Sequence, residues 1–189
     1  RAITWSASSV DGFASRKVVG RSCMDLILWR HAEAQQAAAG VDDLSRALTK
    51  KGEKQASRMA AWLDRHLPEG TRVLVSPAVR TQQTAAALDR KFKLRDELVP
   101  ETTANDVLSL LKWHVDSGPQ VKGPVLLVGH QPYLGELVAK LLGMQAHTCP
   151  VRKGGVWWLR TRMRDGQPQT VLLTVACPEL TSSSWDDPS

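Results

Sequence analysis

Residues 25–31 read Asp-Leu-Ile-Leu-Trp-Arg-His, a short apolar run that leads directly into an arginine and a histidine. A continuous apolar run of this length is typical of a strand that is buried on both faces of a sheet. Two further runs have the same character, at residues 73–75 and 125–128. Segments with helical spacing separate the three runs. The pattern therefore predicts an α/β fold with a mainly parallel central sheet flanked by helices on both faces.

The segments between the runs contain recognisable helix signals. Apolar residues recur at helical spacing over residues 56–67, and Thr49 is the expected N-cap of that helix. A second helix is expected over about residues 78–91. A third is expected over residues 103–117, where the first four residues resemble a capping box. Pro132 fits the first position of a fourth helix.

The remaining strands are expected nearer the C-terminus. Residues 94–99 are read as a short edge strand. The runs at 156–163 and 170–176 flank an Asp165-Gly166 turn, which predicts a C-terminal antiparallel hairpin.

The two ends of the chain differ in character from the body. Residues 1–23 are rich in serine, alanine and basic residues, so we expect an N-terminal extension that is not part of the fold, with Met24 as the natural start. Residues 24–180 form the expected domain. Residues 181–189 are polar and are expected to be a disordered tail.

Composition excludes several classes of protein. No apolar run reaches the roughly 20 residues that cross a bilayer, so no membrane segment is expected. The three cysteines are scattered, which argues against a zinc site or a disulfide framework and favours a cytoplasmic protein. The net charge is +6, of which +5 lies in the body. That charge suits an anionic substrate or an acidic partner, and no nucleic-acid motif accompanies it.

Charged or ionisable side chains follow each of the three apolar runs. Arg30 and His31 follow the first, and Gly129 and His130 follow the last. Arg80 comes shortly after the middle run, within the first turn of the next predicted helix. Because ligands bind beyond the carboxyl ends of parallel strands, these side chains are expected to meet at one edge of the sheet.

Such a set is suited to phosphoryl chemistry. Two guanidinium groups offer forked donors to phosphate oxygens and stay charged at any working pH. A neutral His31 can attack phosphorus, while the arginines and His130 stabilise the charge of the transferred group. Gly129 is expected to allow backbone to approach a ligand. Taken singly, each histidine is more often structural than catalytic. His66, His114 and His147 are read as structural, with His114 on the 103–117 helix.

Four signatures in this order resemble those of the histidine phosphatase superfamily, which includes the phosphoglycerate mutases. They are residues 29–32 (WRHA), 48–56 (LTKKGEKQA), 76–84 (SPAVRTQQT) and 128–130 (VGH). The match extends over roughly residues 24–180 and is most similar to the small SixA-like branch of phosphohistidine phosphatases. The resemblance implies a phosphoglycerate mutase-like fold.

The resemblance also implies roles for individual residues. His31 is the implied nucleophile, and Arg30, Arg80 and His130 are the implied phosphoryl-binding residues, with no cofactor or metal ion. Ala32 stands where the family has glycine. This is expected to be a tolerated change, although alanine would strain a backbone with positive φ. Larger relatives use a carboxylic acid to protonate an ester leaving group. Here Glu101 and Glu33 are the nearest candidates, and neither lies in a clear acid motif.

The favoured hypothesis is a phosphatase that removes phosphate from phosphohistidine on a phosphocarrier or phosphorelay protein. One alternative is a general small-molecule phosphomonoesterase, which predicts a hidden general acid. A second is a non-catalytic phosphate-binding module. A mutase is disfavoured, because retention of the phosphoryl group requires a site closed to water. The sequence assigns no nucleic-acid or membrane partner and no oligomeric state.

Overall fold

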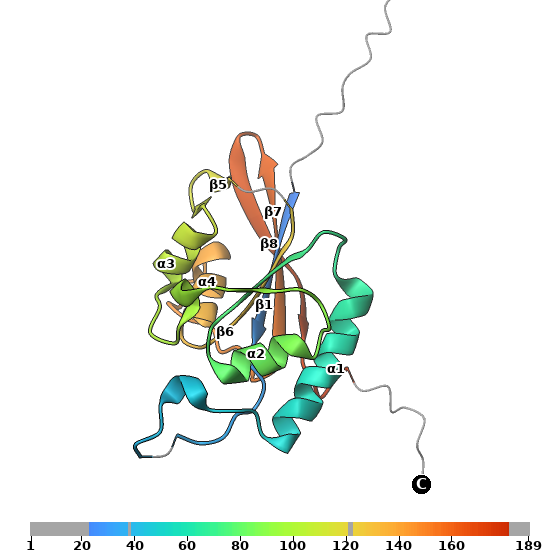
Figure 1. Ribbon diagram of the computed structural model, residues 1–189. Coiled ribbons are helices and arrows are strands. Elements are labelled where there is room, and N and C mark those ends of the chain that lie inside the picture. Colours follow the sequence, from blue (N-terminus) through green and yellow to red (C-terminus); the bar gives the residue numbers. More distant parts are fainter. Residues whose placement is uncertain (1–22, 38, 121–122, 182–189) are drawn as a thin grey trace, which may run out of the picture.

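The computed structural model describes residues 23–37, 39–120 and 123–181, and its centre is a six-stranded sheet with the order β3-β2-β6-β1-β7-β8 (Figure 1). The strands are β1 (Cys23–Arg30), β2 (Arg72–Val75), β3 (Lys93–Leu94), β6 (Val125–Gly129), β7 (Val156–Arg164) and β8 (Gln167–Ala176). Strands β3, β2, β6 and β1 pair in parallel, whereas β7 and β8 are antiparallel to their neighbours. The predicted mainly parallel sheet with a C-terminal hairpin is confirmed.

Helices cover both faces of this sheet, also as predicted (Figure 1). They are α1 (Lys50–His66), α2 (Val79–Ala86), α3 (Ala104–Leu110) and α4 (Tyr133–Leu141). Alternate residues of β1 point to opposite faces. Ile27 and Trp29 pack with α1 and α2, whereas Leu26 and Leu28 pack with α3 and α4. Both cores therefore depend on β1, which explains why its residues form a continuous apolar run.

The predicted N-terminal caps of α1 and α3 are confirmed, whereas the predicted start of α4 is one residue too early. The Thr49 side chain accepts a hydrogen bond from the Gly52 backbone at the start of α1. Thr103 and Asp106 form a capping box at the start of α3. Pro132 is the N-cap residue of α4, one position before the first helical residue.

Other expectations for this part of the chain were wrong. Helix α3 ends at Leu110, because Lys112 adopts a left-handed conformation with φ of 48°. His114 consequently lies on β4 (Trp113–His114), which pairs with β5 (Gly118–Pro119) in a separate small sheet, and not on a helix. The expected edge strand over 94–99 is reduced to β3, and a 3-10 turn at Asp96–Leu98 follows and buries Leu98. Helix α2 also ends earlier than predicted, at Ala86.

The predicted N-terminal extension and C-terminal tail lie outside the described residues, apart from Cys23, which begins β1, and Thr181. Helix α1 has 17 residues, and every helix in the described ranges is too short or too polar to cross a membrane.

The first turn of α1 lies directly against the loop that follows His31. A Cβ atom placed on Gly52 would be 1.9 Å from the backbone oxygen of Glu33. The Thr49 amide donates to that same oxygen over 3.0 Å. Gly52 is therefore required by the close approach of two backbones.

We expect Gly52→Ala to lower the free energy of unfolding by about 2 kcal/mol or more, since the loop or the helix must shift. The sign is informative, because Gly→Ala inside a helix otherwise stabilises by up to about 1 kcal/mol. Urea unfolding measures the change. Lys54→Ala, an exposed substitution in the same helix, is the control and should alter stability by less than about 0.5 kcal/mol. A Gly52→Ala protein as stable as wild type would show that this contact is not tight.

Candidate active site

The strand register brings the ends of three strands to one level. Trp29 of β1 is paired with Val128 of β6, and Val128 is paired with Val75 of β2. The residues that follow these positions therefore surround a single cavity of about 460 Å³. It is lined by Arg30, His31, Ala34, Asp43, Arg46, Arg80, Pro100, Glu101, His130, Gln131 and Lys153. All four residues predicted for the phosphate pocket line this cavity.

His31 is held as a neutral imidazole with a defined tautomer. The side chain is buried, with 7% exposure. Its Nδ1 lies 2.8 Å from the carbonyl oxygen of Ala32. Because a carbonyl only accepts, Nδ1 carries the proton and the lone pair is on Nε2. The pKa of His31 is lowered to about 4, chiefly by burial and also by the charges of Arg80 and Arg30, against the opposing effect of the Ala32 bond. The ring therefore has an unprotonated nitrogen at neutral pH, which a nucleophile requires.

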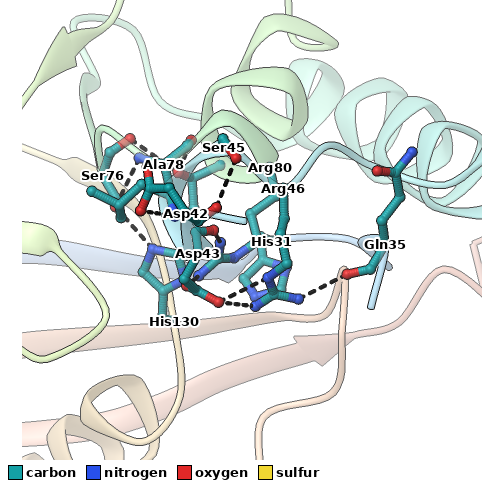
Figure 2. A network of polar contacts seen from close by, with 12 residues as sticks. His31, Gln35, Asp42, Asp43, Ser45, Arg46, Ser76, Ala78, Arg80 and His130 are labelled. Carbon is teal, nitrogen blue, oxygen red and sulfur yellow. Dashed lines mark hydrogen bonds and ion pairs between the residues drawn. The ribbon is translucent and has the colours of Figure 1, made fainter. Parts of the chain in front are cut away.

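His130 lies beside His31, with a ring-centroid distance of 5.2 Å. Its Nε2 is 2.8 Å from the Ser76 hydroxyl oxygen, and this bond fixes the ring (Figure 2). Its Nδ1 is buried and has no hydrogen-bond partner among the described residues. The pKa of His130 is lowered to about 2, chiefly by burial and also by the neighbouring His31.

Two arginines complete the predicted set. Arg30 donates from Nη1 to the Val151 carbonyl over 2.7 Å. The side chain of Arg80 is only 2% exposed. It donates from Nη1 to the Asp43 backbone oxygen over 2.6 Å and from Nη2 to the Asp43 carboxylate over 2.7 Å (Figure 2). Arg46 engages the other oxygen of that carboxylate from Nε and Nη2, at 2.8 and 2.7 Å.

Sequence reasoning missed Asp43, Arg46 and Lys153. Asp43 and Arg46 lie in the segment between β1 and α1, which was read only as a polar loop, and no periodicity marks them. Lys153 reaches the cavity because its neighbours bond to the end of β1. The Gly154 amide donates to the His31 oxygen over 3.0 Å, and the Trp29 indole donates to the Gly154 oxygen over 3.0 Å. The glycine pair after Lys153 was the available signal.

Several signature residues hold the backbone around His31 and do not line the cavity. The Thr84 hydroxyl accepts a hydrogen bond from the Ala32 amide over 3.1 Å. The Gln55 side chain accepts from the Glu33 amide over 3.0 Å. Ala32 is fully buried, and it is not among the described non-glycine residues with positive φ, which are Asp89, Lys112 and Asp165. The expected tolerance of alanine at this position therefore has a structural reason.

The structure separates the two acid candidates. Glu101 is exposed at the rim of the cavity. Glu33 is not among the described residues that line the cavity. Its carboxylate is bonded to Lys51 over 3.0 Å and to Thr49 over 3.1 Å, and these hydrogen bonds lower the pKa of Glu33. Glu33 is therefore an ionised surface carboxylate and cannot supply a proton to a leaving group at neutral pH.

Gly129 meets a packing requirement that the sequence did not reveal. A Cβ atom at this position would be 1.9 Å from the Tyr133 hydroxyl oxygen. That hydroxyl donates to the Leu98 carbonyl over 3.1 Å inside the core. Glycine is therefore required here for the packing of Tyr133.

The charge of the cavity suits a phosphoryl group. Arg30, Arg46, Arg80 and Lys153 contribute four positive charges to its lining, against carboxylates at Asp43 and Glu101. Forked guanidinium donors and a neutral imidazole are the groups that bind and accept a phosphoryl group. In the described ranges, no three histidine, cysteine, aspartate or glutamate side chains are grouped so as to hold a metal ion.

Comparison with known proteins gives consistent results. Residues 26–107 match the model of the histidine phosphatase superfamily (branch 1). The phosphohistidine phosphatase SixA homolog of Haemophilus influenzae is 37% identical over 170 residues, covering 82% of this chain and 97% of that protein. Phosphohistidine phosphatase SixA of Escherichia coli K12 is 33% identical over 121 residues, covering 62% of this chain and 74% of that protein. Among solved structures, the protein histidine phosphatase SixA complexed with tungstate has a TM-score of 0.64 and 25% identity, covering 82% of this chain and 97% of that chain.

The buried histidines predict a pH-dependent stability. Between pH 7 and pH 5 the unfolded chain takes up protons on its histidines, whose ordinary pKa is about 6.5. Folded His31 and His130 stay neutral, because burial lowers their pKa values to about 4 and about 2. The unfolded state then binds more protons, so stability falls as the pH falls. Each histidine is expected to cost roughly 2 kcal/mol at pH 5.

Urea unfolding at pH 7 and pH 5 tests this expectation. In His31→Asn the loss of stability between the two pH values should be smaller than in wild type by roughly 2 kcal/mol. His147→Asn changes an exposed histidine and should leave the loss as it is in wild type. An equal loss in all three proteins would show that His31 is not held neutral by the fold.

Proposed function

The chain belongs to the histidine phosphatase superfamily, in its SixA-like branch, and on that basis we propose that it is a phosphatase that acts through a phosphohistidine formed on His31. One observation carries the proposal. His31 keeps Nδ1 on the Ala32 carbonyl and thereby leaves Nε2 unprotonated, in a cavity that Arg30 and Arg80 line. These are the requirements of a nucleophile that attacks phosphorus between fixed positive charges.

The proposed reaction has two displacement steps. In the first, the His31 Nε2 lone pair forms a bond to phosphorus while the bond from phosphorus to the leaving group breaks, and the leaving group takes up a proton from water. In the second, water attacks the phosphohistidine and the P–N bond breaks, which regenerates neutral His31 and releases inorganic phosphate. The proton that the attacking water loses neutralises the hydroxide left by the first step. Arg30 and Arg80 neutralise the phosphoryl oxygens in both steps. His130, fixed by Ser76, lies beside the reacting atoms as a further contact to the transferred group.

The proposed substrate is phosphohistidine on a phosphocarrier or phosphorelay protein, in the cytoplasm that the sequence predicts. A phosphorylated imidazole loses its phosphoryl group with little help, whereas an ester needs an acid to protonate the departing alkoxide. Two carboxylates near His31 are poorly suited to that task. Hydrogen bonds hold the pKa of Glu33 low, and they also lower the pKa of Asp43 although burial opposes this. The H. influenzae and E. coli relatives are named phosphohistidine phosphatases, which agrees with this substrate class.

The remaining carboxylate favours one alternative, a small-molecule phosphomonoesterase. Glu101 lines the rim of the cavity and could protonate an ester leaving group. A non-catalytic phosphate-binding module needs no nucleophile, so a neutral His31 with a free Nε2 argues against it.

Residues 24–180 are proposed as the catalytic domain.

We expect His31→Ala to reduce phosphate release by at least about a thousandfold, because the nucleophile is removed, while the circular dichroism spectrum stays that of wild type. His66→Ala, at an exposed histidine outside the cavity, is the control and should retain turnover. Rapid quenching of wild type in alkali should trap an alkali-stable, acid-labile phosphoenzyme that His31→Ala lacks. Normal turnover by His31→Ala would exclude the mechanism.

The substrate class is tested by comparing a histidine-phosphorylated carrier protein with p-nitrophenyl phosphate, both in EDTA. We expect kcat/KM to be at least about a hundredfold higher for the phosphoprotein, since a missing general acid costs the ester reaction about that factor or more. Glu101→Gln should change the phosphoprotein rate by less than about threefold.

The opposite pattern would support the esterase. In that case wild type turns over the ester as fast as the phosphoprotein, and Glu101→Gln slows the ester reaction by about a hundredfold or more.

A further inference from the structure

We propose that Asp43 is an internal competitor for the phosphoryl site: its carboxylate occupies Arg80, the phosphoryl group of a ligand displaces it, and inorganic phosphate is therefore held weakly. The inference rests on the proposed function, because it takes the cavity to be a phosphoryl site. It assigns to Asp43 a role in setting affinity, distinct from nucleophilic attack or proton transfer.

The first argument is that Asp43 lies between Arg80 and solvent. The side chain of Arg80 is 2% exposed, whereas that of Asp43 is 44% exposed. Both Nη atoms of Arg80 already donate to Asp43, at 2.6 and 2.7 Å. The remaining Nε is buried and has no partner among the described residues. A phosphoryl group in the cavity therefore meets the two Nη atoms that Asp43 engages (Figure 2), and it competes with the carboxylate for the charge of this guanidinium.

The second argument is that the Asp43 carboxylate keeps a cationic partner when it leaves Arg80. Arg46 holds the other carboxylate oxygen from Nε and Nη2 and is itself 21% exposed. Arg46 also donates from Nη1 to the Gln35 carbonyl over 2.8 Å. When the carboxylate leaves Arg80, it keeps a cationic partner at the surface, so the displaced charge is not stranded in an apolar environment. Arg80 meanwhile exchanges a singly charged partner for a doubly charged phosphoryl group.

The consequence follows from competition. A site that is available in only a fraction of the molecules binds its ligand more weakly by that fraction. If Asp43 holds Arg80 in about nine molecules of ten, phosphate binds about tenfold more weakly than it would otherwise. A protein substrate offsets this loss with contacts beyond its phosphoryl group, whereas inorganic phosphate has no further contacts. Asp43 thus favours release of the product phosphate.

Calorimetric titration with inorganic phosphate, and with tungstate as a tetrahedral analogue, tests the role of Asp43 without requiring turnover. We expect Asp43→Asn to bind both anions at least about tenfold more tightly than wild type. Asp42→Asn is the matched control, since it removes the same charge from the adjacent residue. The side chain of Asp42 accepts a hydrogen bond from the Leu44 amide and not from Arg80. It should change the affinity by less than about twofold.

The opposite role, in which Asp43 positions Arg80 for phosphate, predicts weaker binding by Asp43→Asn. Unchanged or weaker binding by a folded Asp43→Asn protein therefore overturns the inference, and equal tightening by Asp42→Asn overturns it as well. If neither wild type nor the variants bind phosphate or tungstate, the proposed function itself fails.

A crystal structure of the wild-type protein with tungstate provides a test that does not depend on the folding of a variant. Separation of the Asp43 carboxylate from Arg80 supports displacement. An intact Asp43–Arg80 pair beside bound tungstate overturns it.

Discussion

The parallel pairing of β1, β6 and β2 is the constraint on which the site depends. One register places Trp29, Val128 and Val75 side by side, so the three strands end at the same level of the sheet. A slip of one residue in β1 would exchange its two buried faces. It would move Ile27 and Trp29 out of the core that α1 and α2 complete. The energy of core burial thus fixes the position of Arg30 at the end of β1 and of His31 directly after it, and the geometry of the proposed active site follows from hydrophobic packing.

Burial then determines the chemistry of the groups placed there. His31 and His130 are 7% and 2% exposed, and their desolvation disfavours the imidazolium form. An exposed histidine beside a phosphate would tend to be protonated and would lose its lone pair. Here the arginines supply the positive charge that a phosphoryl group requires, which leaves the histidines neutral. The arginines stay charged and the histidines stay neutral because the intrinsic pKa values of the two side chains differ.

The sequence predicted this arrangement well where local rules govern the chain. Arg30, His31 and His130 were placed correctly because each follows an apolar strand directly. Helix α3 was overextended because the apolar spacing of Val107, Leu110 and Leu111 continues to Val115, although the chain has already turned at Lys112.

Residues that reach the cavity through long-range contacts left no such pattern. Asp43 is placed by its bonds to Arg80, and Lys153 by backbone bonds between the 151–155 segment and the end of β1. A further residue, Gly129, was assigned to ligand approach because its packing partner Tyr133 lies on a different element. The four signatures likewise mix two functions, since Gly52, Gln55 and Thr84 contact the backbone of Ala32 and Glu33 and do not line the cavity. Their role is to fix the loop that follows the proposed nucleophile. A protein that retained Arg30, His31, Arg80 and His130 but lost these supports would keep the reacting groups and lose the geometry that makes them act together.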